Sequence, residues 1–559
     1  MCVWSLNLLL YSPSPRRASQ RILALRAISS FASCCLPLKV LSSSRVYSSS
    51  SRSLPMNSPT NQYSYSVSST STVPHVGVIG AGLSGLRCAD ILLQRGVRVT
   101  ILEARDRVGG RVYQSHIGGI PVDLGPNWIH GTEKNPIADL SKTTNTVTHS
   151  WEGAQAIIDK DGHHLDKKAA NKVIEFMWTT IDKAFEYSRK NSNAIPASKS
   201  LFDYFVEELE NTKFDDHEKE ACLEFCKLWG SYIGAPVDRQ SLKFFFLEEC
   251  IEGNNLFLAS TYKNILDHIA KPALEGAEIH LNDAVVGIEG HTRKPGTKHE
   301  VKVTTAAGKH YNFDEVVVTL PLGVLKQTKT SLFTPPPPER LSKAIDSISY
   351  GGLEKVYVHF PTPFWHVQEL PTGGPRSETE LPAVFTQFMT PNYTPHPPTP
   401  FWNPECVSLA ALPTQCAHPT LLFYFYPPFS TYIVTTLSSL KPHSPAYNDA
   451  LTAFLQPYYS RLPNYSPASP DCQPLAFLAT SWQTDPYAGN GSYSNFQVGL
   501  EEGDRDIEVM REGMGMERGV WLAGEHTAPF VALGTTVGAY WSGEEVAGRV
   551  CDMVFGSKV

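Results

Sequence analysis

The sequence predicts an α/β protein with a Rossmann-like parallel sheet and a second region of mixed helices and strands. Three observations support this fold class. A glycine-rich turn joins an apolar strand to a helix near the start of the periodic part of the chain. A second apolar strand follows and ends in an acid. Further β-rich stretches come later, after a mainly helical segment, so one sheet is expected to collect strands from distant parts of the chain.

The first predicted unit is a strand, a tight turn, a helix and another strand. His75–Ile79 is a short β-branched run, which is typical of a buried strand. Apolar residues then recur near helical spacing up to Gly96, and Val97–Leu102 forms the second predicted strand. The glycines between the first strand and the helix stand in G-x-G-x-x-G spacing, at Gly80, Gly82 and Gly85.

Glu103 completes the pattern of a dinucleotide-binding fingerprint. It follows the second strand directly and lies 23 residues after Gly80. In such units the glycines permit a tight turn and close backbone approach, the helix N-terminus faces a pyrophosphate, and the acid binds ribose hydroxyls. A glycine pattern alone is weak evidence. Its place between a strand and a helix, followed by a correctly spaced acid, makes the prediction specific.

The segment after Glu103 favours a flavin over a nicotinamide cofactor. Residues Arg105–Arg111 read Arg-Asp-Arg-Val-Gly-Gly-Arg, and a nicotinamide-binding unit does not need this second glycine turn. The segment resembles that of the flavin-containing amine oxidase family, which includes polyamine oxidases, monoamine oxidases and lysine-specific histone demethylases. The resemblance implies a two-dinucleotide-binding FAD domain, an α+β substrate domain, and an arginine, Arg111, that returns to the phosphates.

The later segments alternate between the two expected domains. Residues 135–275 place Lys, Glu and Phe at helical intervals, whereas Ala277–Val303 alternates as strands do. Asp314–Leu325 contains a buried strand and the Leu-Pro-Leu-Gly-Val-Leu sequence that the family also has. We predict FAD-binding segments at 75–135, 275–340 and 478–559, and substrate-domain segments at 136–274 (mainly helical) and 341–477.

The resemblance extends to the last FAD-binding segment and implies a set of cofactor-binding residues. Gly524-Glu525-His526-Thr527 and Gly534–Tyr540 match the block that closes the FAD site in the family. There Thr536 and Val537 would offer backbone amides at a helix start, whose dipole favours an anionic flavin. The cofactor-binding residues expected on these grounds are Gly80, Gly82, Ser84, Gly85, Glu103, Arg105, Arg111, Val285, Trp482, Glu525, Thr536 and Val537.

Three residues are candidates for catalysis and substrate contact. Lys355 lies in an alternating strand, where an inward lysine is costly unless it has a function. It matches the family lysine that holds a water against flavin N5. Tyr493 matches one wall of an aromatic cage around the substrate nitrogen. His130 resembles a histidine near the substrate amine in polyamine oxidases, although a structural histidine would fit its loop almost as well.

The expected activity is that of a polyamine oxidase with non-covalent FAD. Such an enzyme oxidises the carbon next to an amine nitrogen, the imine hydrolyses to aldehyde and amine, and oxygen is reduced to hydrogen peroxide. No cysteine lies between Cys472 and Cys551, so the covalent flavin of monoamine oxidases is not expected. The alternatives are an oxidase of another primary amine or amino acid, and a non-catalytic binding protein on the same fold.

Composition limits the partners. Hydrophobic residues make up 42% and charged residues 18% of 559 residues, typical of a globular protein with two or three domains. The apolar stretch Leu421–Val434 is interrupted by two prolines and predicts core strands, not a membrane span. Eleven cysteines without C-x-x-C pairs predict neither a metal site nor a disulfide framework. The partners expected are a small amine and O2, not nucleic acid. No pattern in the sequence predicts an oligomeric state.

The first 74 residues have their own composition. They hold six arginines, one lysine and no acid, so the remainder of the chain carries a net charge of −14 against −7 overall. Such a segment suits an organelle transit peptide, and equally an extension upstream of a true start at Met56. We expect a mitochondrial or cytoplasmic location. The C-terminal Ser557-Lys558-Val559 differs by one residue from the peroxisomal Ser-Lys-Leu signal and leaves that location open.

Overall fold

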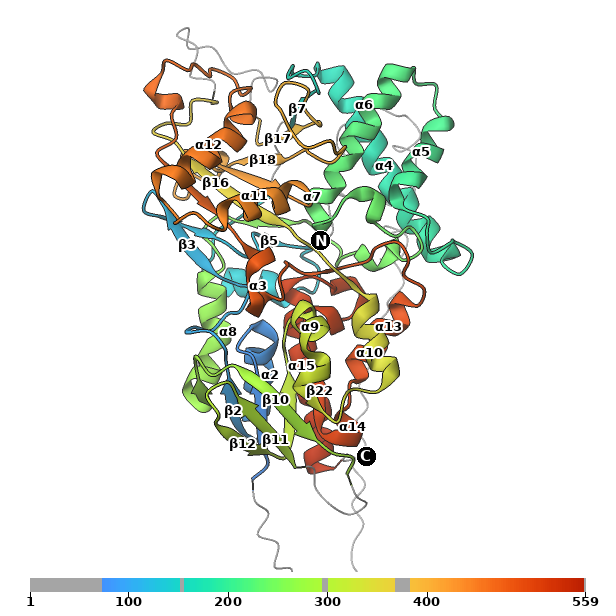
Figure 1. The fold of residues 1–559 in the computed structure, drawn as a ribbon, viewed down its shortest axis with the longest axis vertical. Coiled ribbons are helices and arrows are strands. Elements are labelled where there is room, and N and C mark those ends of the chain that lie inside the picture. The colour runs from blue at the N-terminus through green and yellow to red at the C-terminus, as the bar shows by residue number, and fades with distance from the viewer. Residues whose placement is uncertain (1–72, 151–154, 294–299, 367–382, 557–559) are drawn as a thin grey trace, which may run out of the picture. The chain divides into compact units, whose positions relative to one another are not determined.

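Five parallel strands form the sheet from which the glycine-rich turn leads. The computed structural model describes residues 73–150, 155–293, 300–366 and 383–556. It places these strands in the order β22–β13–β1–β2–β9, all parallel to their neighbours. The strands are β1 (His75–Ile79), β2 (Arg98–Leu102), β9 (Glu278–His280), β13 (Glu315–Val318) and β22 (Val520–Leu522). The α/β fold class is confirmed, and the sheet joins opposite ends of the chain (Figure 1).

Two helices pack closely beside the glycine turn. They are α2 (Leu83–Gln94) and α15 (Thr536–Phe555), and their apolar faces share one core cluster with the parallel sheet. A Cβ on Gly543 of α15 would lie 2.2 Å from the carbonyl oxygen of Ser84. Only glycine therefore lets α15 approach the first turn of α2 so closely. This contact brings the last segment of the chain against the first.

The helix α8 (Lys263–Gly276) runs across the predicted boundary at residue 274 and packs on α2. Its apolar side chains, such as Ile265 and Ile269, share a core with Leu86 and Leu92 of α2, and α3 (Pro136–Thr143) joins the same cluster. Both helices therefore share a core with the parallel sheet, although they begin within the predicted substrate segment 136–274. Helical periodicity reveals an apolar stripe, but not the surface against which that stripe packs.

Four other strands between Val285 and Thr334 form a second, smaller sheet. Its order is β12–β11–β10–β14, and the first three strands are joined by antiparallel pairing as a meander. The strands are β10 (Val285–Gly290), β11 (Val301–Thr305), β12 (His310–Phe313) and β14 (Phe333–Thr334). The alternating pattern that predicts strands after Ala277 is confirmed here.

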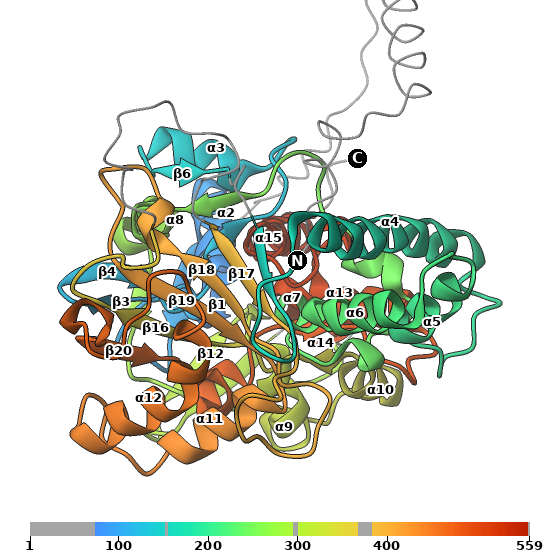
Figure 2. The same ribbon diagram turned by 90° about the horizontal axis from the view of Figure 1, so that it is seen from above.

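A six-stranded sheet lies in the upper half of the molecule as Figure 1 draws it. Its order is β20–β16–β19–β18–β17–β7, and every pair except β17–β7 is antiparallel. Figure 2 shows α11 and α12 along one side of this sheet, and α4, α5 and α6 gathered on the other side of the molecule. The bounds are β7 (Gln155–Ile158), β16 (Glu354–His359), β17 (Phe385–Phe388), β18 (Glu405–Ser408), β19 (Thr420–Phe425), β20 (Ala476–Ala479), α4 (Lys167–Asn191), α5 (Leu201–Glu210), α6 (Asp216–Cys226), α7 (Gly230–Ile233), α11 (Phe429–Leu437) and α12 (Pro445–Tyr459).

The apolar stretch Leu421–Val434 is only half strand. It begins in β19, turns at Pro427 and Pro428, and continues as α11, so the expectation of strands throughout is wrong. The apolar residues of both elements pack into one aromatic core, in which Phe423 and Phe425 lie with Phe429. In the described parts of the chain, no helix is long and apolar enough to cross a membrane.

Further strands and α-helices complete the described fold. They are β3 (Gln114–Ile117), β4 (Ile120–Asp123), β5 (Trp128–Ile129), β6 (Thr148–His149), β8 (Leu256–Leu258), β15 (Ser349–Tyr350), β21 (Ser494–Asn495), α9 (Leu322–Leu332), α10 (Glu339–Ser347), α13 (Gly503–Glu512) and α14 (Gly515–Arg518). Apart from Val73 and Pro74, the predicted targeting segment lies outside the described residues, as does the C-terminal tripeptide.

Candidate active site

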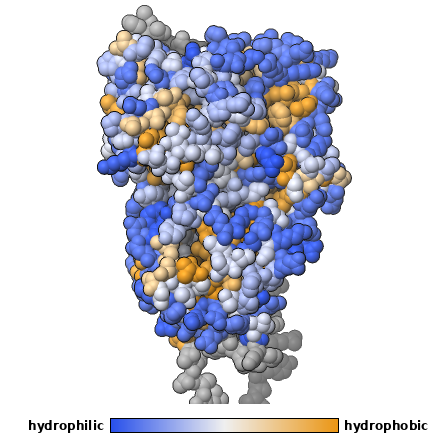
Figure 3. Space-filling view, viewed as in Figure 1, coloured by the Kyte–Doolittle hydropathy of each residue, from blue (hydrophilic) through white to orange (hydrophobic). Residues whose placement is uncertain are grey.

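A cavity of about 660 Å³ extends from the glycine turn to the six-stranded sheet. Figure 3 shows a hollow flanked by hydrophobic side chains in the lower half of the molecule, where Figure 1 draws α2 and α9. Most of the residues predicted from the sequence line this cavity. They are Gly80, Gly82, Ser84, Glu103, Arg105, Arg111, His130, Val285, Lys355, Trp482, Tyr493, Glu525 and Thr536.

The glycine turn presents bare backbone to the cavity. Gly80 has a φ of +104°, which side chains rarely tolerate. A Cβ on Gly85 would lie 2.0 Å from the carbonyl oxygen of Gly80, so Gly85 stands behind the wall and serves packing. A Cβ on Gly82 would meet no protein atom within 4 Å and would project into open space instead. The turn is therefore shaped to admit a ligand against the N-terminus of α2.

Glu103 is held rigidly at the end of β2. Its side chain is 6% exposed, and each carboxylate oxygen accepts one backbone N–H. Oε2 accepts that of Ala81 at 2.7 Å, and Oε1 accepts that of Arg105 at 2.8 Å. A carboxylate oxygen has lone pairs for a further bond. Glu103 can therefore accept bonds from ligand hydroxyls without moving.

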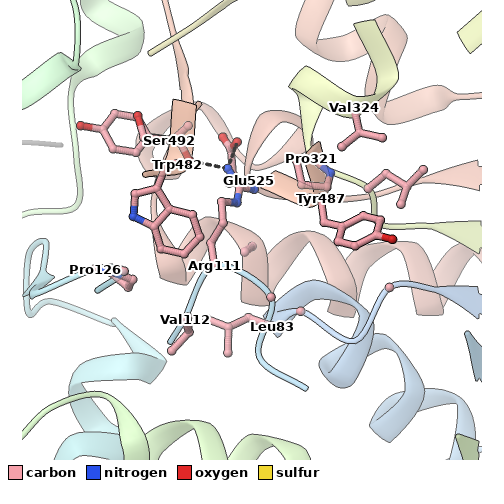
Figure 4. A pocket seen from close by; sticks show the side chains of 18 of the residues that line it. Leu83, Arg111, Val112, Pro126, Pro321, Val324, Trp482, Tyr487, Ser492 and Glu525 are labelled. Carbon is pink, nitrogen blue, oxygen red and sulfur yellow. Dashed lines mark hydrogen bonds and ion pairs between the residues drawn. The ribbon is translucent and has the colours of Figure 1, made fainter. Parts of the chain in front are cut away.

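An ion pair between Arg111 and Glu525 lies at the centre of the cavity wall (Figure 4). Arg111 Nη1 donates to Glu525 Oε1 at 3.0 Å and to the carbonyl oxygen of Ser492 at 2.7 Å. Burial alone would raise the pKa of Glu525, but the charge of Arg111 and a hydrogen bond from Ser494 outweigh it, so the pKa lies below its usual value. Glu525 is thus an anion, and Arg111 a cation already paired within the protein.

The helix α15 begins at the cavity. Thr535 caps it, because its side chain accepts the backbone N–H of Gly538 at 3.0 Å, and Thr536 is the first helical residue. The side chain of Val537 is 2% exposed and packs in the core, and Val537 does not line the cavity. Its predicted contact with the cofactor is through the backbone amide at the start of α15, and that contact stays a prediction.

A loop that carries Trp482 and Tyr487 lines the cavity. Figure 4 shows the Trp482 indole reaching toward Arg111, and Tyr487 on the opposite side beside Pro321. Trp482 Nε1 donates to the carbonyl oxygen of Leu124 at 3.1 Å. An ion pair of 2.9 Å joins Asp485 of this loop to Arg105. Arg105 therefore ties this loop to the first FAD-binding segment.

Lys355 of β16 lies buried against the loop 123–127. Its Nζ donates to Gly125 O and Asn127 Oδ1, and to Asp123 O at 3.3 Å. Burial lowers the pKa of Lys355 to about 7, although the nearby carboxylates of Asp123 and Glu354 act in the other direction. The predicted inward orientation is therefore confirmed. Its predicted water-holding role stays a prediction, because the observed contacts are with the loop 123–127.

The cavity ends among aromatic residues that the motifs did not reveal. Tyr424 and Phe385 line it from the six-stranded sheet, and Tyr232 lines it from α7. The predicted cage residue Tyr493 lies with them, and its hydroxyl donates to the carbonyl oxygen of Tyr232 at 3.0 Å. His130 also lines the cavity.

One acid, Glu405, belongs to the same end and was also missed. It lines the cavity and follows the proline-rich stretch Pro391–Pro404 directly. The available signal was an acid directly before two apolar residues, Cys406 and Val407.

Comparisons with known proteins agree with this geometry. A family model described as flavin containing amine oxidoreductase matches residues 83–551. Polyamine oxidase 4 of Oryza sativa subsp. japonica is 31% identical over 318 residues, which cover 54% of this chain and 62% of that protein. A corticosteroid-binding protein of Candida albicans is 26% identical over 86% of this chain and 96% of its own length.

A solved structure shows the same fold. Wild-type putrescine oxidase bound to putrescine superposes with a TM-score of 0.62, at 17% identity, over 86% of this chain and 99% of that one. The chain spans less than two thirds of the length of the first curated relatives that it matches.

Proposed function

Because the chain belongs to the flavin-containing amine oxidoreductase family, we propose that it oxidises polyamines or diamines and uses molecular oxygen as electron acceptor. The observation that carries this proposal is the continuity of one cavity from the glycine turn to a buried lysine and an aromatic end. A cofactor and a substrate can therefore meet inside it. The names of relatives that are polyamine oxidases support the substrate class.

FAD, the cofactor expected of this family, fits the residues present. The space that a Cβ on Gly82 would enter is left open, and the Glu103 carboxylate faces it with capacity to accept hydrogen bonds. Residues that would hold FAD are those of the glycine turn, Glu103, Arg111 and the first turn of α15. When bound, FAD supplies hydride acceptance from the carbon beside an amine nitrogen and passes the electrons to oxygen, which forms hydrogen peroxide.

The chain's own residues supply orientation and a dry environment. Trp482 and Tyr493 provide aromatic walls, and Lys355 is buried among loop carbonyls. Because its pKa lies near 7, Lys355 can hold or release a proton at Nζ close to neutral pH. The substrate nitrogen must be neutral to release a hydride from the neighbouring carbon, and a desolvated aromatic site favours the neutral amine. The imine then hydrolyses to an aldehyde and an amine.

A peroxide-release screen tests this proposal. Purified protein with bound flavin is mixed with spermine, spermidine, putrescine, monoamines and amino acids, and peroxide is measured with a coupled assay. We expect peroxide from at least one diamine or polyamine. Peroxide from amino acids alone would contradict the substrate class, and no peroxide with any amine would contradict the activity.

A second candidate function is binding of a steroid without oxidation. The match to the corticosteroid-binding protein covers nearly all of that protein, and aromatic residues line the far end of the cavity. Equilibrium binding of a labelled corticosteroid, measured beside anaerobic flavin bleaching by amines, separates the two functions. Flavin reduction by amines without steroid binding would exclude this candidate.

Two further parts of the proposal concern how FAD is attached and where in the cell the protein is located. We propose that the FAD is non-covalent, and acid precipitation should therefore leave the flavin in the supernatant. We also propose a mitochondrial or cytoplasmic location, with the peroxisome as alternative. Fluorescent fusions with and without residues 1–55, tagged at the N-terminal side of the C-terminal tripeptide, would distinguish these locations.

A further inference from the structure

Three neutral oxygen atoms surround the buried amine of Lys355. Its Nζ donates to the backbone carbonyl oxygens of Asp123 and Gly125, and to Oδ1 of Asn127. An ammonium group has three N–H bonds, so these three acceptors satisfy the charged form of the side chain completely. A neutral amine has two N–H bonds and a lone pair. In the neutral form, one of the three neighbours must therefore donate a hydrogen bond to Nζ, or the lone pair stays without a partner.

Of the three acceptors, the side-chain amide of Asn127 is the one that can become a donor. The other two are backbone carbonyl oxygens, which only accept. A turn of the amide by 180° exchanges Oδ1 and Nδ2, which are so alike in size that the packing hardly changes. Asn127 is 5% exposed and lines the cavity, and its backbone carbonyl oxygen accepts the N–H of Leu258 at 2.8 Å. The loop can therefore stay in place while the amide turns.

Two tyrosine hydroxyl groups complete a network around this amide. Tyr424 Oη donates to Asn127 Oδ1 at 3.0 Å, and Asn127 Nδ2 donates to Tyr357 Oη at 3.4 Å. Tyr357 Oη in turn donates to the carbonyl oxygen of Asp123 at 2.6 Å. A hydroxyl group both donates and accepts, so each tyrosine can reverse its hydrogen bond with the amide when the amide turns.

The turned amide satisfies the neutral form of Lys355. Nδ2 of Asn127 then donates to the Nζ lone pair and to Tyr424 Oη, and Oδ1 accepts the hydroxyl hydrogen of Tyr357. The two remaining N–H bonds of Lys355 keep the two backbone carbonyl oxygens as acceptors. The hydroxyl hydrogen of Tyr424 is released from Asn127 and can point into the cavity, which Tyr424 lines. Each protonation state of the lysine thus has its own complete set of hydrogen bonds.

The charged groups that face Lys355 are bonded to other partners. The carboxylates of Asp123 and Glu354 raise the pKa of Lys355 through space, whereas burial has the larger effect and lowers it to about 7. The Asp123 carboxylate accepts a hydrogen bond from Gln114 at 2.7 Å, and the Glu354 carboxylate accepts one from Thr480. The direct hydrogen-bond partners of Nζ are thus neutral, and both protonation states are accessible near neutral pH.

We propose that Asn127 is a positioning residue that accommodates both protonation states of Lys355 by turning its side-chain amide. This inference rests on the proposed function, in which Lys355 holds or releases a proton at Nζ. When Nζ loses a proton to water, the amide turns from acceptor to donor, and the return of the proton reverses the turn. Asn127 therefore keeps Nζ in one place at either charge, and it sets the pH at which the charge changes.

Substitutions at Asn127 should move the pH dependence of the flavin reactions. Flavin-loaded protein is reduced with dithionite and mixed with oxygen in a stopped-flow instrument between about pH 5.5 and 9.5, and anaerobic reduction by an amine is followed over the same range. Asn127→Asp offers only acceptors and adds a negative charge, so we expect the pH midpoint that belongs to Lys355 to rise by roughly 1–3 pH units. Asn127→Leu removes one acceptor of the buried ammonium, so the midpoint should fall.

A double variant and a control show whether Asn127 acts through Lys355. In Lys355→Met the midpoint should be absent, and adding Asn127→Leu to that variant should leave its pH profile unchanged. Asn403→Asp is the matched control, because Asn403 is also buried and its Oδ1 accepts a hydrogen bond from the Tyr426 hydroxyl, while Asn403 does not line the cavity. Flavin content is measured for each variant. If Asn127→Asp does not fold, Asn127→Leu carries the test with its lowered midpoint.

Thermal unfolding gives a second readout that needs no turnover. The folded protein gives up the Lys355 proton near pH 7, whereas the unfolded chain keeps it up to about pH 10.5. The cost of burying the charged lysine is therefore complete below about pH 7 and is relieved as the pH rises toward 10.5. The Tm of the wild-type protein relative to Lys355→Met should rise over this range. When both proteins also carry Asn127→Asp, the same rise should begin at a higher pH.

The possible outcomes are distinct. A raised midpoint in Asn127→Asp and a lowered one in Asn127→Leu, both lost with Lys355, support the proposal. Equal loss of rate at every pH with an unmoved midpoint, or a midpoint that persists in Lys355→Met, would overturn it while the amine oxidase function stands. Failure of every amine to reduce the flavin would overturn the proposed function, and the reoxidation of dithionite-reduced protein would still decide the role of Asn127.

Discussion

The two halves of the cavity are built on different principles. At the FAD-binding half, backbone atoms form much of the wall, and the decisive residues are glycines and an acid within one unit of strand, turn, helix and strand. At the substrate half, side chains form the wall, and several of them come from the separate strands β16, β18 and β19, which pair with one another in the six-stranded sheet. The FAD-binding half therefore depends on glycines, whose missing side chains leave room for close approach. The substrate half depends on the charge and shape of a few side chains. Substitutions should affect the two halves in different ways.

Adding a side chain at Gly85 should have the largest effect. Its Cβ would lie 2.0 Å from the carbonyl oxygen of Gly80, and neither backbone can move without opening the turn. We expect Gly85→Val to lose bound flavin almost completely, measured as flavin absorbance per mole of purified protein. Gly548→Ala is the matched control, because a Cβ there meets nothing within 4 Å. Full flavin content in Gly85→Val would show that the turn does not set the cofactor site.

Removal of the Glu103 carboxylate should weaken FAD binding next. The variant Glu103→Ala loses two hydrogen bonds to backbone N–H groups and the acceptor that faces the cavity. Hydrogen bonds to a charged group contribute about 1.5–3 kcal/mol each, so we expect FAD affinity to fall by 10²-fold or more. Titration of the apoprotein with FAD measures this change. Asp106→Ala, at an exposed position of the following turn, should bind FAD as the wild-type protein does.

Lys355 lies at the boundary between the halves, and its substitution should affect rate more than binding. Lys355→Met keeps the length and removes the charge, so we expect turnover to fall by roughly 10²-fold with FAD retained. Stopped-flow measurement of flavin reduction and reoxidation would identify the slowed half-reaction. Lys302→Met, on an exposed strand position, is the control. If Lys355→Met loses FAD instead, the lysine serves mainly to hold the loop 123–127.

The smallest expected effect is a pH-dependent gain in stability at the substrate half. Burial raises the pKa of Glu405 to about 7, above its usual value of 4.5, so the folded protein retains a proton that the unfolded chain releases. That contribution to stability is complete below about pH 4.5 and is lost as the pH rises through 7. Glu405→Gln should therefore raise Tm by about 1–3 °C near pH 8 and little near pH 4.5. A lower Tm near pH 8 would show that the carboxylate stabilises the fold.

Much of the FAD-binding half could be predicted because its signals are local. Gly80, Gly82, Gly85 and Glu103 act within one strand–helix–strand unit, so their spacing along the chain sets their spacing in space. Lys355 could also be predicted, because strand alternation placed its side chain toward the interior, where a lysine is costly unless it has a function. The fold class followed from the same periodicities, and the sheet order confirms it.

The substrate half required the tertiary structure because its residues meet only through strand register. Glu405 and Tyr424 become neighbours of Lys355 through pairing across β18, β19 and β16, and a shift of one residue would turn them to the other face. The packing partner of α8 and the burial of Val537 were decided in the same way, by which surfaces meet. The sequence alone determined the FAD-binding unit and its chemistry, because these depend on backbone geometry over short distances. Only the assembled sheet decided which side chains of its separate strands line the far end of the cavity together.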